Sequence, residues 1–254
     1  FQTIGNIIEL IEKDDIPKYL LFLENAFPYM DNYNYHKGMN GIIQELKCLL
    51  KTKSIGTDSD RALLLDFQAT LETKPEKAIK LEKDALAQIE NITADNARLV
   101  SNLHANLGGL YRMNGHPDLA REHMEKSISL LDQFNLLHIN DSIPQIANYA
   151  MFLTEQQEPE RGISELQKLS GIIKEYHSDD CLDYAKVQET LGTIYLMTAN
   201  LPQAKTHFKR AFKIYEKIWA DEPEMIEAKY QEIQELYPQI GFCIGKNLSG
   251  LLTK

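Results

Sequence analysis

Residues 106–111 read Asn-Leu-Gly-Gly-Leu-Tyr, and residues 190–195 read Thr-Leu-Gly-Thr-Ile-Tyr. Midway between them, residues 148–153 read Asn-Tyr-Ala-Met-Phe-Leu, so the three stretches stand 42 residues apart. A second series with the same spacing consists of small residues: Ala78, Ala120, Gly162 and Ala204. A fixed period of about 20–50 residues is typical of solenoid proteins, so we predict that the chain is an array of repeated units.

Each unit is predicted to contain two helices joined by a short turn. In the unit that starts near residue 97, we expect the first helix over 97–113 and the turn over 114–117. The second helix then places four residues on one face, at spacings of four, four and three: Ala120, Met124, Ile128 and Leu131. No strand pattern is found, which favours an all-α fold.

The glycines of the repeat indicate a close contact between helices. Glycine in a helix interior costs up to about 1 kcal/mol, so a repeated glycine needs a reason. We expect Gly108 and Gly192 to lie where two helices approach each other, with Tyr111 and Tyr195 packed beside them.

The boundaries of the array are set where the 42-residue pattern weakens toward the two ends of the chain. We predict one helical-repeat domain over 1–254, with four 42-residue repeats over 57–223. Residues 1–56 are interpreted as an N-terminal lead-in with a degenerate repeat, and residues 224–254 as C-terminal capping helices. Degenerate ends are expected where a repeat must cover the last apolar face.

Composition excludes several classes of function. With 27 basic and 37 acidic residues the net charge is −10, so neither nucleic acid nor a membrane surface is an expected partner. The three cysteines and seven histidines show no disulfide or metal spacing, so no metal, cofactor or catalytic residue is predicted. The cysteine usage favours a reducing compartment, the cytoplasm. Because the chain begins at Phe1, we expect it to be a piece of a longer protein.

These residues resemble the tetratricopeptide repeat. Its pattern is a Leu-Gly pair, a Tyr three residues later, and then an Ala with a large residue four positions on. The full match is Leu191, Gly192, Tyr195, Ala204 and Phe208. His104 and Gln188 stand where the family has a Trp, and a period of 42 in place of the usual 34 is similar to the kinesin-light-chain-like branch. The general pattern is also similar to the repeat region of larger bacterial regulatory proteins.

The resemblance implies a right-handed superhelical solenoid of about six antiparallel helix pairs, in which the first helices line the concave wall. On that wall we expect partner contacts from five residues: Asn102, Asn106, Arg112, Asn148 and Lys186. An asparagine amide can donate to and accept from a peptide backbone at once. The alternative is that these side chains are solvated or bonded between adjacent helices.

Two further surfaces are candidates for partner binding. Tyr29, Tyr33 and Tyr35 form a cluster of aromatic residues, which are common in interfaces but can equally cap the end of an array. Five basic residues lie within 205–217, where the alternative is an ordinary solvated face.

The sequence therefore predicts a non-catalytic scaffold that binds a protein or an extended peptide, as the interaction or sensor segment of a larger regulatory protein. The first alternative is an intracellular receptor for a short signalling peptide held in the concave groove. The second alternative is an enzyme, or an enzyme subunit, whose site the sequence does not reveal.

Overall fold

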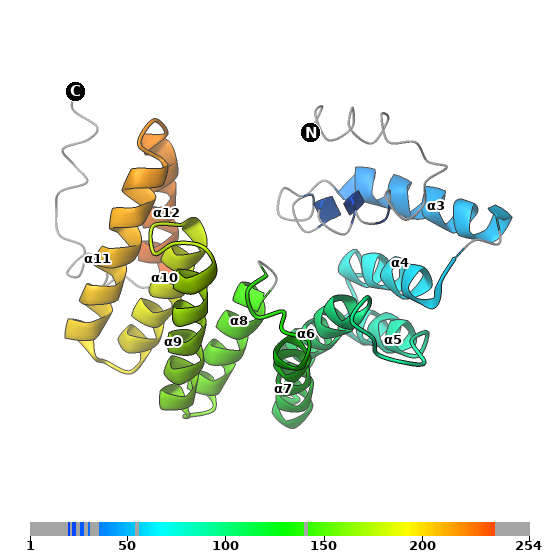
Figure 1. Cartoon of the computed structure of the whole chain (residues 1–254), viewed down its shortest axis with the longest axis horizontal. Helices are drawn as coiled ribbons and strands as arrows, with labels where there is room; N and C mark the ends of the chain where they lie inside the picture. The colour runs from blue at the N-terminus through cyan, green and yellow to red at the C-terminus, as the bar shows by residue number, and fades with distance from the viewer. Residues whose placement is uncertain are drawn as a thin grey trace. The chain divides into compact units, whose positions relative to one another are not determined.

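The computed structural model describes residues 20, 22–23, 26–27, 30, 36–53, 56–139 and 142–236. The predicted tyrosine cluster (Tyr29, Tyr33, Tyr35) and residues 237–254 of the predicted cap lie outside the described residues. Regular structure in the described part is entirely helical, as predicted: α3 His36–Lys53, α4 Asp58–Thr70, α5 Pro75–Leu86, α6 Ala97–Met113, α7 Pro117–Gln133, α8 Ser142–Glu155, α9 Pro159–Tyr176, α10 Leu182–Met197, α11 Leu201–Ile218 and α12 Pro223–Leu236 (Figure 1).

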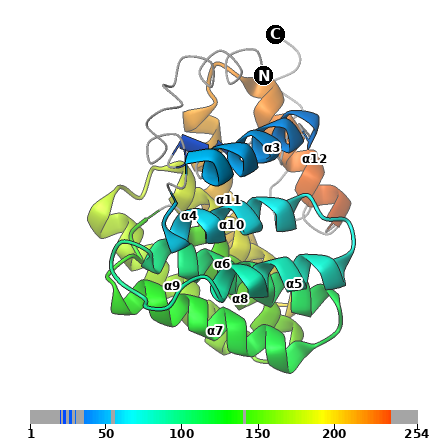
Figure 2. The ribbon, with the colours of Figure 1, turned by 90° about the vertical axis from the view of Figure 1, so that its right-hand side faces the viewer.

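The chain forms two compact units, Phe1–Leu130 and Leu131–Lys254. In the first unit α3 packs on α4, and α4 packs on α5 (Figure 2). In the second unit α8 pairs with α9 and α10 pairs with α11, while α10 also packs on α9 (Figure 1). The second helices begin at residues 75, 117, 159 and 201, which are 42 residues apart. The helix α6 confirms the prediction for residues 97–113.

The turn within a helix pair is the same in three successive repeats. Gly115, Gln157 and Ala199 stand 42 residues apart and have φ angles of +72°, +64° and +58°. In each turn the amide of the following residue donates to a carbonyl five residues earlier in the first helix, over 2.8–2.9 Å. This is the Schellman arrangement, which needs one residue in the left-handed conformation. The turn geometry therefore holds whether or not that residue is glycine.

Small residues mark the closest contacts between paired helices, as predicted. A Cβ added at Gly108 would lie 2.6 Å from Met124 Cγ, and one at Gly192 would lie 2.9 Å from the ring of Phe208. A Cβ at Gly162 would lie 2.6 Å from the carbonyl oxygen of Ala150, which cannot move aside as a side chain can. The missing side chains are what allows the helices of each pair to approach.

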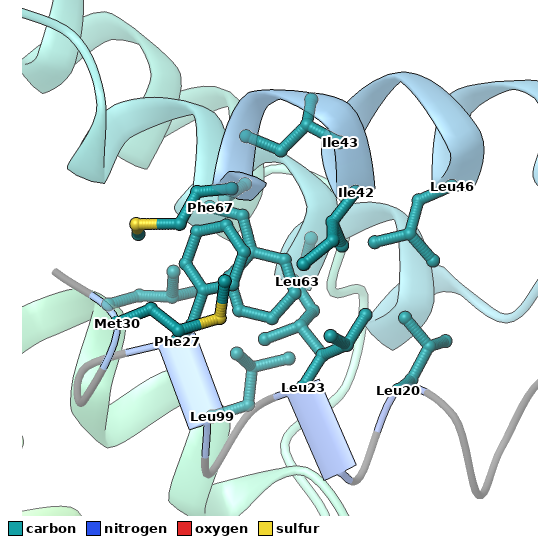
Figure 3. Close-up of a cluster of buried hydrophobic side chains, with 14 residues drawn as sticks. Leu20, Leu23, Phe27, Met30, Ile42, Ile43, Leu46, Leu63, Phe67 and Leu99 are labelled. Carbon is teal, nitrogen blue, oxygen red and sulfur yellow. The ribbon is translucent and has the colours of Figure 1, made fainter. Parts of the chain in front are cut away.

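The core of the first unit begins before the regular repeats. Leu20, Leu23 and Phe27 are buried against α3 and α4 (Figure 3). The ring of Phe27 stacks on Phe67 with centroids 4.0 Å apart. Ile43 of α3 belongs to the same buried cluster, and Ile42 lies on the side of α3 that faces Leu23 (Figure 3). These residues carry the helical pattern of the predicted degenerate repeat, and they cover the apolar face of α4.

The helix α12 is attached to α10 and α11 by apolar and polar contacts. Ile226 and Ile233 are buried. The Tyr215 hydroxyl donates to Glu189 Oε2 over 2.6 Å, and Lys229 Nζ lies 3.1 Å from the other oxygen of Glu189. Burial alone would lower the pKa of Lys229, but the adjacent carboxylates outweigh burial and raise it. The first part of the predicted cap is therefore a packed helix, while capping itself stays a prediction.

Candidate partner-binding site

The helix α6 separates a buried face from an exposed polar face, as the spacing predicts. Leu107, Gly108 and Tyr111 are buried against neighbouring helices. On the other side Asn102 is half-buried and Asn106 is exposed. Arg112 is half-buried near the end of the same helix, and its neighbour Met113 is 75% exposed. Three of the five predicted contact residues thus lie on one helix of the first unit.

Asn106 already has partners inside that unit. Its amide nitrogen donates to Asp66 Oδ1 over 2.9 Å and to Glu82 Oε1 over 3.2 Å. These carboxyls come from α4 and α5, so the Asn106 side chain links three helices. The alternative to partner contact was that these side chains bond between adjacent helices. Asn106 has such bonds, although part of its side chain remains exposed.

Sequence reasoning did not single out Asp66 and Glu82. Glu82 is 2% exposed, and its Oε2 atom is buried with no hydrogen-bond partner among the described residues. Burial is the main cause that raises the pKa of Glu82, to about 10; repulsion from Asp66 and a hydrogen bond with it add to the effect, while Asn106 opposes it. At neutral pH the pair therefore holds a proton.

The repeat register could have found this pair. Asp66 stands 42 residues before Gly108, and Glu82 stands 42 residues before Met124. The two carboxyls thus occupy the positions at which the next repeat has a glycine packed on an apolar side chain.

Two histidines of the first unit lie at the contact between paired helices, and a third lies at the equivalent contact of the second unit. His104 and His123, from α6 and α7, face each other with their Nδ1 atoms 2.9 Å apart. Two repeats later Gln188 Oε1 lies 2.9 Å from His207 Nδ1. These pairs fill the position of the missing tryptophan, and they confirm that His104 packs in a helix interface. Burial, with repulsion from His123, lowers the pKa of His104 to about 4.

The second unit contains the other two predicted contact residues. Asn148 of α8 is exposed, and its amide has no hydrogen-bond partner among the described residues. Lys186 of α10 is exposed, with its Nζ atom 3.6 Å from Asp183 Oδ1. Because α8 packs on α10, these two side chains belong to neighbouring first helices. Among the three asparagines predicted to contact a partner, Asn148 is thus the one that is exposed and has no hydrogen bond to a described residue.

The described residues offer no candidate metal site. They contain no group of three His, Cys, Asp or Glu side chains able to hold a metal ion. A shallow depression of about 430 Å³ lies between α9 and the end of α10, and Glu160 is the one ionisable acid among its lining residues. In the part of the chain that is described, no helix has the length and hydropathy needed to cross a membrane.

A family model agrees with the repeat geometry. The model described as tetratricopeptide repeat matches residues 142–217, which span α8 to α11. This match agrees with the resemblance to the tetratricopeptide repeat that the sequence shows. Such repeats generally mediate interactions between proteins. No curated protein matches this sequence.

Solved structures of low sequence identity share the fold. The chain is similar to BtubC (BKLC) from P. vanneervenii, with a TM-score of 0.62, 18% identity, and coverage of 81% of this chain and 83% of that one. It is also similar to the nearly identical TPR-like repeats of a candidate kinesin light chain from P. anserina, in two crystal structures. Their TM-scores are 0.60 and 0.58 at 12% and 13% identity, covering 80% and 77% of this chain and 98% and 96% of those chains. These likenesses confirm the predicted helical-repeat fold.

Proposed function

We propose that this chain is a non-catalytic scaffold that binds an extended segment of another protein along its first helices. One observation supports this most: repeats of a protein-binding family bury one face of each first helix and leave amide and cationic groups on the other. An exposed amide can satisfy both the donor and the acceptor of a bound peptide backbone.

The proposed contacts fall into two sets, one in each unit. In the first unit they are Asn102, Asn106 and Arg112, and in the second they are Asn148 and Lys186. Lys186 and Arg112 would pair with acidic side chains of the bound segment. Asn106 must exchange its bonds to Asp66 and Glu82 for bonds to the partner, so we expect Asn148 to contribute more per side chain.

We place this activity in the interaction segment of a larger regulatory protein of the cytoplasm. Neither Cys48 nor Cys181 forms a disulfide among the described residues, which suits a reducing compartment. The net charge of −10 disfavours nucleic acid as the partner. The open amide of Asn148 also suits a short signalling peptide, which would make the chain a peptide receptor.

The test is a capture experiment with the 254-residue chain as bait, followed by affinity measurements on the captured protein. The variant Asn148→Ala/Lys186→Ala removes an amide and a charge from two first helices. Each lost hydrogen bond contributes about 0.5–1.5 kcal/mol, and more where a charge takes part, so we expect binding to weaken about tenfold.

A matched control removes exposed amides from second helices instead: Gln133→Ala, Gln167→Ala and Gln203→Ala. This control should bind as the unchanged chain does. Equal affinity of the first-helix variant, or equal loss in the control, would place the partner elsewhere.

A further inference from the structure

The exposed face of α11 is mostly basic, and Glu216 near its end is the one exposed acidic residue of this helix. Lys205, Lys209 and Lys213 follow one another at intervals of four residues, and all three are exposed. They lie on the side of the helix opposite its buried residues, which include Phe208 and Tyr215. None of the three forms an ion pair with a described residue. We call these three residues the lysine strip.

Other basic groups of this helix are already engaged. Lys217 forms an ion pair with Asp180, and Arg210 Nη1 donates to the Tyr184 hydroxyl over 3.5 Å. The bond from Lys217 is the main cause that lowers the pKa of Asp180, and the charge of Lys213 adds to it. The positive charge at the Lys213 end of the strip thus favours the ionised form of a nearby carboxylate, Asp180.

Among the equivalent helices, α7 and α9 lack such a strip, whereas α5 has three exposed lysines at intervals of three residues, Lys77, Lys80 and Lys83. The exposed residues of α9 include both signs, and Arg161 there is paired with Glu158. In α7 Arg121 lies within 3.9 Å of Glu125. The lysine strip, which has no ion-pair partner among the described residues, thus distinguishes α11 from α7 and α9 in a chain whose net charge is −10.

An exposed apolar side chain adjoins the strip at one end, and another lies at the end of the preceding helix. Leu201 is 51% exposed and lies one helical turn before Lys205. Met197, at the end of α10, is 42% exposed. Exposed apolar side chains beside a charged row suit a ligand that combines an apolar side chain with charge of the opposite sign.

We propose that Leu201 and the lysine strip form a second docking surface, which binds an acidic segment of a protein partner through its carboxylates and one large apolar side chain. The strip spans eight residues, or about 12 Å of helix, which matches a few carboxylates of one segment. A DNA duplex or a membrane surface would extend beyond the strip over a chain with an excess of acidic residues. This surface lies on a second helix and is independent of the first-helix contacts proposed above.

The experiment uses a labelled synthetic peptide, one phenylalanine followed by six glutamates, and measures its fluorescence anisotropy with the full chain. The test variant is Lys205→Gln/Lys209→Gln/Lys213→Gln. The control variant removes three exposed lysines from other second helices, Lys77→Gln/Lys80→Gln/Lys126→Gln. Both variants lose the same net charge, so only the position of the charge differs.

Exposed ion pairs are individually weak, so loss of three should raise the Kd of the peptide about 3- to 100-fold in the strip variant. The control should change it less than twofold. Leu201→Ser should weaken binding of the phenylalanine peptide but not of hexaglutamate, and added salt should weaken binding of both peptides.

Equal loss of affinity in the two lysine variants would overturn the proposal. So would absence of peptide binding at millimolar concentration, or tighter binding to duplex DNA or to phosphatidylserine vesicles than to the peptide.

Discussion

Two helix pairs have the same close contact between their helices but fill it with different side chains. They are α4–α5, the first pair of regular repeat helices, and α10–α11, the last. In α10–α11, Gly192 faces the ring of Phe208. The corresponding positions of α4–α5 hold Asp66 and Glu82, whose carboxyl oxygens both accept from the amide of Asn106. One contact is a small residue under an aromatic ring, and the other is a pair of carboxyls.

This difference shows what the repeat requires. The backbone needs a short side chain facing a long one at this contact, but it does not need both to be apolar. A carboxyl pair can occupy the place if a proton removes one charge and if a donor, here Asn106, binds the oxygens. The contact between Gly192 and Phe208 needs neither a proton nor a hydrogen-bond donor, so its contribution to stability should not depend on pH.

The largest expected effect is the pH dependence of the carboxyl contact. The pKa of Glu82 is raised from 4.5 to about 10 in the folded chain, so between these values the folded state holds a proton that the unfolded state has lost. Stability is then greatest below the unfolded value and falls as pH rises, by at most about 1.4 kcal/mol per pH unit. We expect Glu82→Gln to unfold at higher urea than the parent at pH 9 and to differ less at pH 6.

The control for this prediction is Glu76→Gln, which changes an exposed carboxylate of the same helix. Its stability should follow that of the parent across the same pH range. If Glu82→Gln also follows the parent, the two carboxyls do not share a proton.

The apolar version of the contact should fail by overpacking. Gly192→Leu places atoms where the ring of Phe208 lies, and overpacking a helix contact costs about 1–3 kcal/mol. Gly171→Leu is the matched control, because a Cβ at Gly171 meets nothing within 4 Å. Urea unfolding should show a loss for Gly192→Leu alone; a parent-like midpoint for that variant would mean that the repeat register is misread.

The histidine pair should depend on pH in the opposite direction. The pKa of His104 is lowered from 6.5 to about 4, so between these values the unfolded state binds a proton that the folded state does not. Stability is then lost as pH falls through this range. His104→Gln copies the Gln188–His207 pair and should reduce the loss between pH 7 and pH 5 by up to about 2 kcal/mol, measured by thermal unfolding. An unchanged acid profile in this variant would show that His104 titrates normally.

The smallest effect concerns the turn that both helix pairs share. Ala199 has φ +58° at the position where an earlier repeat has Gly115. The left-handed conformation costs a non-glycine residue about 1–2 kcal/mol, so Ala199→Gly should stabilise the chain by about 1 kcal/mol or less. The reverse change, Gly115→Ala, should destabilise it by a similar amount in the same melting experiment, and equal melting points would show that the turns are not equivalent.

Periodicity in the sequence was enough to predict the helices and their closest contacts. The bounds of α6 and the contacts at Gly108 and Gly192 follow from spacing, because a repeated backbone places equivalent residues in equivalent surroundings. The left-handed turns at Gln157 and Ala199 were not foreseen, since neither residue has a preference for that conformation. The spacing of 42 residues between Gly115, Gln157 and Ala199 could have predicted the same turn at all three positions.

The candidate site was less predictable, because hydrogen bonds depend on neighbours far away in sequence. Asn106 could be placed on the polar face of its helix, but its partners come from residues 40 and 24 positions earlier. Asn148 has the equivalent position in the next repeat, and among the described residues it has no such partners. The sequence thus predicts which face is polar, and the neighbouring repeat decides which amides are open.

The central claim is that one helix contact recurs through the repeats and accepts a carboxyl pair only because the pair keeps a proton. The most direct measurement is a carbon-13 NMR titration of the Glu82 carboxyl in the 254-residue chain, assigned with Glu82→Gln. We predict that the Glu82 carboxyl carbon shows a pKa well above 7, near the value of about 10 that burial and Asp66 impose. A pKa of 4 to 5, typical of an exposed glutamate, would contradict the claim.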